Sequence, residues 1–143
     1  SGRPAVVVPI LTIRRLPPER VLIAWDGSRE AARATHDALP FLRLARETVV
    51  LIVDPGELAD RVGDPPGTDL AAHLAHHGVA ARVKPVAGSR AGAIDTILAQ
   101  VEEEAADLLV MGGYGHSRLR EMMLGGTTRH MIERMTVPVL LAH

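Results

Sequence analysis

The chain of 143 residues contains no cysteine and only three aromatic side chains, Trp25, Phe41 and Tyr114. The lack of cysteine excludes disulfides, thiolate nucleophiles and cysteine-ligated metal sites. The shortage of aromatic rings removes the stacking surfaces that bind single-stranded nucleic acid. With 16 basic and 17 acidic residues, the formal charge of -1 also provides no positive field for a polyanion. We therefore expect no nucleic acid partner.

Long apolar segments are also missing. No run of about 18 apolar residues is present. The start of the chain shows no charged segment followed by an apolar core and a small-residue cleavage site. We therefore expect a soluble, cytoplasmic protein without a membrane partner. The apolar content of 47% is sufficient for a single buried core, so we expect one globular domain.

Short β-branched or leucine-rich runs alternate with longer helical segments along the chain. The expected strands cover residues 21–25, 49–53, 79–86, 108–111 and 137–141. We expect a helix from about Arg29 to Arg46 that Pro40 kinks or divides, and a second that Thr68 caps and Gly78 ends. Further helices are expected after Gly88-Ser89 and around Met131 to Met135. This alternation predicts an α/β fold with a parallel sheet, helices on both faces and right-handed crossovers.

Two glycine turns stand near the end of the chain. Gly112-Gly113-Tyr114-Gly115 follows the apolar run 108–111, and Gly125-Gly126-Thr127-Thr128 begins after nine intervening residues. Because glycine has no Cβ, such turns let backbone N–H groups approach a ligand closely. The second turn also precedes a helix, whose N-terminus favours negative charge. The pattern is typical of a phosphate site.

A third turn, Asp26-Gly27-Ser28, follows the strand at 21–25. In doubly wound sheets, ligands bind beyond the carboxyl ends of the strands, where the winding direction reverses. If this strand and the strand at 108–111 are neighbours, both turns line one crevice. The carboxylate of Asp26 can then accept hydrogen bonds from ribose hydroxyls, while backbone N–H groups of the glycine turns meet the phosphates.

Two other glycine motifs are excluded by the residues themselves. A dinucleotide fingerprint requires a third glycine where Arg118 follows Gly113-Tyr114-Gly115. A P-loop requires lysine followed by serine or threonine, whereas the only lysine, Lys84, precedes Pro85 in an expected strand.

The glycine pattern resembles the nucleotide-binding branch of the universal stress protein family. That branch has Gly, two residues, Gly, nine residues, then Gly followed by Ser or Thr, and Gly112, Gly115 and Gly125 match this spacing. The resemblance extends from about Arg20 to His143 and includes the turn at Asp26. It implies a five-stranded parallel doubly wound sheet of order 3-2-1-4-5 with helices on both faces. The first residues of the chain add the expectation of an extra N-terminal strand.

The resemblance also implies a site for ATP, ADP or AMP, with any Mg²⁺ carried by the nucleotide. Asp26 is then the ribose-side carboxylate, and Ile52 is the strand position whose backbone meets adenine. The other implied binding residues are Ala24, Met111, Gly112, Gly115, His116, Gly125, Gly126, Thr127 and Thr128.

Gly126 departs from the family pattern, which has Ser or Thr at this position. A hydroxyl contact with phosphate is lost unless Thr127 or Thr128 supplies it. A hydrogen bond to a charged group is worth roughly 1.5–3 kcal/mol. The expected affinity is therefore lower by about one to two decades.

The first residues resemble the last ones. Residues 3–9 and 136–141 each place a proline beside an aliphatic strand. We interpret residues 1–17 as an N-terminal strand and linker left from a preceding copy of the domain, with 18–143 as the universal stress protein domain; the alternative is an ordinary N-terminal arm. Because final strands pair between subunits in the family, we expect a homodimer through edge strands Val137–Leu141, Ala5–Ile10 or both. The first strand can pair with the last one either inside the chain or in a partner subunit.

Three functions remain open from the sequence. The preferred one is an ATP-binding stress-response regulator; the others are a slow ATPase and a dimerisation scaffold that has lost the nucleotide. A catalyst should show a paired base and nucleophile or carboxylates for Mg²⁺. Beyond Asp26 no such group is assigned to the site, so we name no catalytic residue and lean against an enzyme. In the ATPase alternative, His116 or an arginine would orient the water.

Two polar clusters are interpreted as surface features. His73, His76 and His77 share a helix face at a spacing that can hold a metal, but no carboxylate is clearly placed on that face. We therefore expect no metal site. The acidic run Glu102 to Glu104 is expected to be a solvated helix end.

Overall fold

The computed structural model describes residues 3–10, 16–54, 56, 60, 66–88, 92–112 and 127–142, and for 127–130 it describes the backbone alone. Within these residues, six strands form one sheet in the order β1-β6-β5-β2-β3-β4. The strands are β1 (Ala5–Val7), β2 (Arg20–Ala24), β3 (Glu47–Val53), β4 (Ala81–Val86), β5 (Leu108–Gly112) and β6 (Val139–Ala142). Neighbouring pairs from β4 to β6 are all parallel. The predicted order 3-2-1-4-5 is confirmed, with β2 as its first strand.

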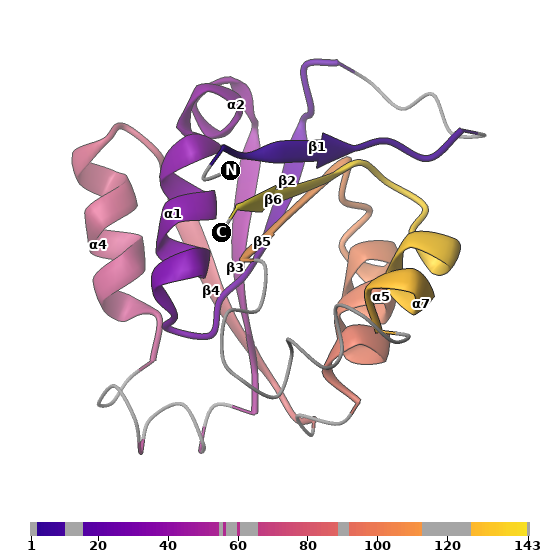
Figure 1. Ribbon diagram of the computed structural model, residues 1–143. Helices are drawn as coiled ribbons and strands as arrows, with labels where there is room; N and C mark the ends of the chain where they lie inside the picture. Colours follow the sequence, from indigo (N-terminus) through magenta and orange to yellow (C-terminus); the bar gives the residue numbers. More distant parts are fainter. Residues whose placement is uncertain are drawn as a thin grey trace.

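Helices cover both faces of this sheet (Figure 1). The helices α1 (Arg29–Asp37), α2 (Leu39–Leu44) and α4 (Thr68–His76) lie on one face, and α5 (Ala93–Glu103) and α7 (Thr127–Arg134) lie on the other. Two apolar cores fill the layers: one packs around Ile23, Ile52 and Leu74, and the other around Leu22, Leu109 and Met131. Successive residues of β2 alternate between them, because side chains of a strand alternate between faces.

Pro40 divides the first helical segment as predicted. Helix α1 ends at Asp37, and α2 begins at Leu39 with Pro40 in its first turn. Proline lacks the N–H that an interior helical position requires, but the first turn leaves that donor unused. The hydroxyl of Ser28 accepts from Ala31 N at 3.1 Å and caps α1, which also agrees with the sequence.

Two expected helix starts are wrong in detail. Gly67, with φ 84°, is the N-cap of α4, whereas Thr68 is its first residue. This left-handed φ favours glycine, and a Cβ at Gly67 would also lie 3.1 Å from Ile52 Cδ1, which is closer than an ordinary contact. Helix α5 begins at Ala93 after Gly92, later than Gly88-Ser89 suggests; residues 89–91 lie outside the described residues. Gly78, with φ 78°, follows α4 as predicted.

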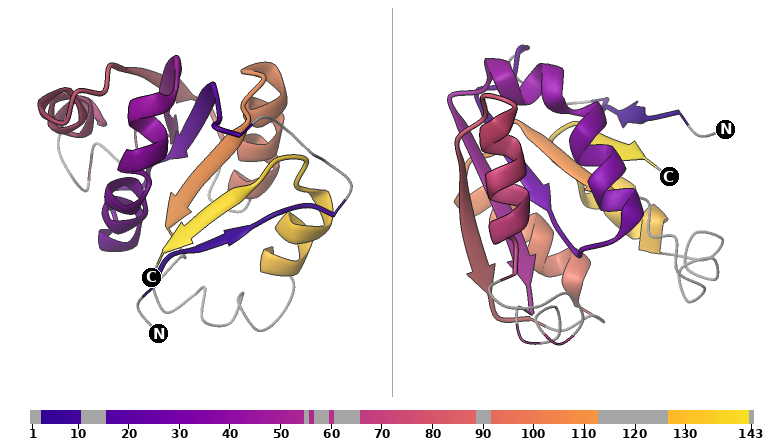
Figure 2. Two further views of the ribbon diagram at one scale, coloured as in Figure 1. Left: turned by 90° about the horizontal axis from the view of Figure 1, so that it is seen from above. Right: turned by 90° about the vertical axis from the view of Figure 1, so that its left-hand side faces the viewer.

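The N-terminal segment completes the sheet. Strand β1 pairs antiparallel with β6 of the same chain, with Ala5 opposite Leu141 and Val7 opposite Val139 (Figure 2). Strand β6 therefore has a neighbour on each side, β5 and β1. Among the described strands, β1 and β4 are the edges, so Val137–Leu141 presents no open edge for a partner subunit.

Candidate functional site

The turns after β2 and β5 start from neighbouring strands. Ala24 lies opposite Met111 in the parallel register, so both strands end together at the carboxyl end of the sheet. This pairing meets the condition that the two strands are neighbours, whereas the shared crevice of the two turns stays a prediction. This carboxyl end of β2 and β5, where Asp26 and Gly112 lie, is called the crevice end.

Gly112 fits the crevice end because it has no side chain. A Cβ there would lie 2.5 Å from Ala31 N and 2.7 Å from Glu30 C, both backbone atoms of the first turn of α1. Side chains essentially never approach the backbone so closely, and a helix backbone cannot move aside locally. Glycine therefore lets the end of β5 pack directly on the N-terminus of α1.

Asp26 shapes the turn between β2 and α1. Its Oδ1 accepts a hydrogen bond from Ser28 N at 2.9 Å, and Gly27 between them adopts φ 72°. This is an Asx turn, in which a short carboxylate replaces a backbone acceptor. A carboxylate has further acceptor capacity on its two oxygens. Because Asp26 is half-buried, its carboxylate can hold the turn and still accept from a ligand hydroxyl.

Three other predicted residues line the strand ends. Ile52 is fully buried within β3 and Met111 is 2% exposed, so their side chains belong to the two cores. A ligand at the crevice end would reach them through the backbone. Ala24, the last residue of β2, is half-buried on the face covered by α5 and α7.

The predicted phosphate cradle is only partly described. Gly115, His116, Gly125 and Gly126 lie outside the described residues. Thr127 and Thr128 begin α7, and the structure describes their backbone alone. The expectation that the second glycine turn leads into a helix is thus confirmed, whereas the contacts of the cradle stay a prediction.

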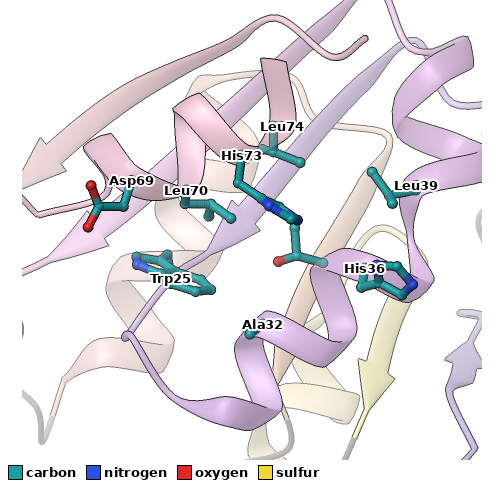
Figure 3. A pocket seen from close by; sticks show the side chains of 9 residues that line it. Trp25, Ala32, His36, Leu39, Asp69, Leu70, His73 and Leu74 are labelled. Carbon is teal, nitrogen blue, oxygen red and sulfur yellow. The ribbon is translucent and has the colours of Figure 1, made fainter. Parts of the chain in front are cut away.

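A cavity of about 290 Å³ lies between α1 and α4 (Figure 3). The sequence analysis did not predict this cavity. Trp25 and Asp69 lie toward one end of it, and His36 lies at the other, beyond His73. Trp25 reaches this side because it follows Ala24 in the alternation of β2. The alternation of side chains along residues 21–25 was therefore the feature of the sequence from which the position of Trp25 on this face could have been predicted. The hydroxyl of Thr35 in the wall is already satisfied, since it donates to Ala31 O at 2.8 Å.

The acidic run at the end of α5 is solvated only in part, because Glu102 and Glu103 are exposed as expected whereas Glu104 is half-buried. Glu104 accepts from Arg82 at 2.8 Å and from Lys84 at 2.6 Å, while Glu103 accepts from Lys84 at 2.9 Å. Hydrogen bonds to the two glutamates raise the pKa of Lys84, and those from Lys84 lower the pKa values of Glu103 and Glu104. These charges cover the edge strand β4, a common protection against edge-to-edge pairing.

Among the described residues, no helix has both the length and the apolar content needed to cross a bilayer.

Comparisons with known proteins agree with this architecture. The model of the universal stress protein family matches residues 18–143. A universal stress protein of Synechocystis, Slr1230, is 31% identical over 131 residues, which cover 85% of this chain and 41% of that protein. The universal stress protein MJ0577 of Methanocaldococcus jannaschii is 34% identical over 47 residues, 33% of this chain and 29% of that protein. The aligned segments thus cover less than half the length of each of these two curated relatives.

Solved structures give the same result. A universal stress protein from Archaeoglobus fulgidus superposes with a TM-score of 0.73 at 26% identity, covering 99% of this chain and 50% of that one. A universal stress protein in complex with cAMP has a TM-score of 0.66 at 20% identity, covering 89% of this chain and 98% of that one. With the family match over residues 18–143, the chain belongs to the universal stress protein family.

Proposed function

We propose that this protein binds an adenine nucleotide at the crevice end and acts as a regulatory stress-response protein in the cytoplasm. The observation that carries the proposal is the shared end of β2 and β5, which brings the Asp26 turn beside the first glycine of the Gly112 motif. In doubly wound folds such an end, where strand order reverses, is where ligands bind.

The groups at this end suit a mononucleotide. Asp26 supplies a carboxylate acceptor for ribose hydroxyls, and its Oδ1 already anchors the turn that presents it. Helix α1 begins directly after the Asp26 turn, and helix α7 begins at Thr127, directly after Gly126 in the sequence. The N-terminus of a helix favours the negative charge of phosphates. The backbone N–H groups of Gly115, Gly125, Gly126 and Thr127 are proposed to complete the phosphate contacts.

A separate observation supports adenine as the base of the proposed nucleotide. One solved universal stress protein carries cAMP, which is an adenine nucleotide. The similarity to that protein, at 20% identity, extends to the fold. Adenine nucleotides are accordingly the first ligands to test, and ATP, ADP, AMP and cAMP should be compared directly.

A second candidate function is a scaffold that no longer binds nucleotide, and Gly126 is the residue that favours it. Without a hydroxyl there, affinity depends on Thr127 or Thr128. The retained Asp26 turn and the Gly112 packing favour the binding protein instead.

The test measures nucleotide binding with a matched pair of variants. Purified protein is denatured and its supernatant analysed for nucleotide, and calorimetric titrations with the four nucleotides give Kd values. Asp26→Asn keeps an amide oxygen for the Ser28 N–H but removes the charge, so the fold should persist while affinity falls about tenfold or more. Asp69→Asn, outside the crevice end, is the control and should change nothing.

Each outcome selects one function. Absence of bound nucleotide, of a thermal shift and of titration heat in wild-type protein would reject nucleotide binding and favour the scaffold. Steady formation of ADP from ATP would favour the slow ATPase. Equal losses in Asp26→Asn and Asp69→Asn would reject the role of Asp26.

We also propose a homodimer that uses β1 rather than β6. Strand β6 is paired on both sides, whereas the segment Ala5–Ile10 exposes Val6 by 48%, Val8 by 59% and Ile10 by 98%. Sedimentation analysis should show a dimer that Val8→Lys weakens, and a monomer at all concentrations would contradict the proposal. The interpretation of residues 1–17 as the last strand of a preceding domain copy stays a proposal of the same kind.

A further inference from the structure

The cavity between α1 and α4 has the size and the lining of a small-molecule site. Its volume of about 290 Å³ is close to the lower limit, roughly 300 Å³, of typical ligand pockets. The buried side chains of Leu39, Leu70 and Leu74 belong to its lining. Thr35, which is also buried there, already donates its hydroxyl to Ala31 O. The inner part of the cavity therefore suits the apolar body of a ligand.

One end of the cavity combines an aromatic ring with an acidic side chain (Figure 3). Trp25 is half-buried and lies along the cavity with its indole ring, whereas Asp69 is exposed at the rim. The face of an indole ring attracts cations, and a carboxylate near it adds direct charge attraction. Because Asp69 is exposed, its side chain can turn toward a bound group without displacing packed atoms. This end therefore favours a positively charged group.

The other end of the cavity has the opposite electrostatic character. His36 lies at that end, with His73 between it and Trp25 (Figure 3). Arg43 is close by, because its Nε donates to the backbone oxygen of His77 at 3.2 Å and the His77 ring contacts both cavity histidines. A guanidinium repels a cation, whereas imidazole nitrogens can hydrogen-bond a neutral polar group. A ligand with a single positive charge is thus oriented with that charge toward Asp69.

We propose that this α1/α4 cavity binds a small organic amine, cationic at neutral pH, with a ring or branched apolar body. The ammonium group lies between the ring of Trp25 and the carboxylate of Asp69, and the body covers Leu70 and Leu74. Exposed charge contacts are individually weak, so the affinity is modest and most of the selectivity comes from the charge. A neutral or anionic molecule of the same shape lacks the ionic anchor.

The cavity is separate from the proposed nucleotide site. Ala24 packs with the core beneath α5 and α7, whereas Trp25 packs with the core beneath α1 and α4. Successive side chains of a strand point to opposite faces, so the cavity and Ala24 lie on opposite faces of the sheet. Amine binding at the cavity therefore does not require that a nucleotide is bound at the crevice end.

The experiment uses the only tryptophan of the chain as its probe, because Trp25 lines the cavity. The untagged full chain is titrated with phenethylamine, and with phenethyl alcohol and phenylacetate as neutral and anionic molecules of similar shape, at constant ionic strength. Trp25 fluorescence should change with saturation on addition of the amine, and calorimetry gives the Kd values. We expect the amine to bind about three- to fivefold more tightly than the alcohol, and phenylacetate to bind most weakly.

Three variants test the position and the charge of the site. Ala32 is an exposed residue of α1 that lines the cavity, so Ala32→Leu fills the space from the rim and should weaken amine binding by about tenfold or more. Ala72→Leu makes the same change at an exposed position of α4 outside the lining, and should leave the Kd within about twofold. Asp69→Asn should bring the Kd of the amine close to that of the alcohol.

Several results would overturn the proposal. These are the absence of saturable amine binding to wild-type protein, equal Kd values for amine and alcohol, and an unchanged amine Kd in Ala32→Leu or in Asp69→Asn. If no amine binds and Ala32→Leu changes the sedimentation of the protein, a second copy of the chain covers the cavity instead. Far-UV circular dichroism of each variant separates lost binding from lost folding.

Parallel titrations distinguish this site from the nucleotide site. Asp26→Asn should leave the amine Kd unchanged, and Asp69→Asn should leave the nucleotide Kd unchanged. The two proposals therefore stand or fall separately.

Discussion

At the crevice end of the sheet, backbone packs directly on backbone, whereas at the opposite end charged side chains make the contacts. Gly112 lies against the backbone of Ala31 at the first end. At the other end, Asp107 Oδ2 accepts from Glu19 N and Arg20 N, both at 3.0 Å, and Glu104 accepts from two cations. Backbone contacts tolerate no added atom, whereas exposed ion pairs can rearrange or exchange with water. The two ends should therefore respond very differently to single substitutions.

The largest effect is expected for Gly112→Ala. The new Cβ would meet the α1 backbone at 2.5 Å, so strand and helix must separate. Overpacking of this kind costs roughly 1–3 kcal/mol, and here we expect the upper part of that range. Urea unfolding measures it. Gly88→Ala is the matched control, because its Cβ would meet the side chain of Val53 at 2.8 Å rather than backbone, and a smaller loss is expected.

If Gly112→Ala were as stable as wild-type protein, the contrast between the two ends would fail. A loss of nucleotide binding in Gly112→Ala at unchanged stability would instead show that the glycine matters for the ligand alone.

An intermediate effect is expected for Asp107→Ala. The carboxylate holds the N–H groups of Glu19 and Arg20 where β2 begins, and Asp107 N in turn donates to Arg20 O at 2.8 Å. Hydrogen bonds to a charged group contribute about 1.5–3 kcal/mol when buried, and this site is partly exposed, so we expect a loss of about 1–2 kcal/mol. Asp107→Asn keeps one acceptor oxygen and should lose less. Equal losses in the two variants would indicate that the side-chain hydrogen bonds are irrelevant.

The smallest effect is expected for Glu104→Gln, and it should depend on pH. Hydrogen bonds from Lys84 first, and then from Arg82, lower the pKa of Glu104 from 4.5. Its stabilisation is therefore complete above pH 4.5 and is lost as the pH falls from 4.5 toward the lower folded-state pKa. The difference from wild-type protein should be small at pH 7, shrink in high salt and vanish in acid. Glu102→Gln, whose carboxylate accepts from Thr136 rather than from a cation, is the control. A difference that persists in acid would contradict the assignment.

Much of the fold follows from local sequence. The strand predicted at 21–25 is found one residue earlier, at Arg20–Ala24, and Pro40 divides the helical segment as predicted. Gly78 follows the end of α4 as predicted, and all three features depend on nearby residues. The order 3-2-1-4-5 came from the family resemblance, and the pairing of β2 with β5 confirms it.

The missed features depend on residues far apart in the chain. Glu104 meets Lys84 across 20 residues, and no local pattern encodes this contact. The pairing of β1 with β6 inside the chain is one of the two alternatives that the similarity of residues 3–9 to residues 136–141 left open, and the structure selects it. The sequence predicts that His73, His76 and His77 share a helix face. It does not predict the ring of His36 beside that of His77, because His36 belongs to α1. Within the candidate site, Asp26 follows β2 and Gly112 is the last residue of β5, and the ends of these two strands coincide as the sequence predicts. The ligand contacts of both residues stay a prediction.

The register of β1 has a practical consequence for labelling. Ala5 lies opposite Leu141, and Ala142 lies opposite Gly112, so both ends of the described chain emerge beside the proposed ligand site (Figure 2). A fluorophore attached at either terminus would report occupancy of that site by a change in quenching. Expression tags at the same places would lie close to that site, so they should be removed before any affinity is measured.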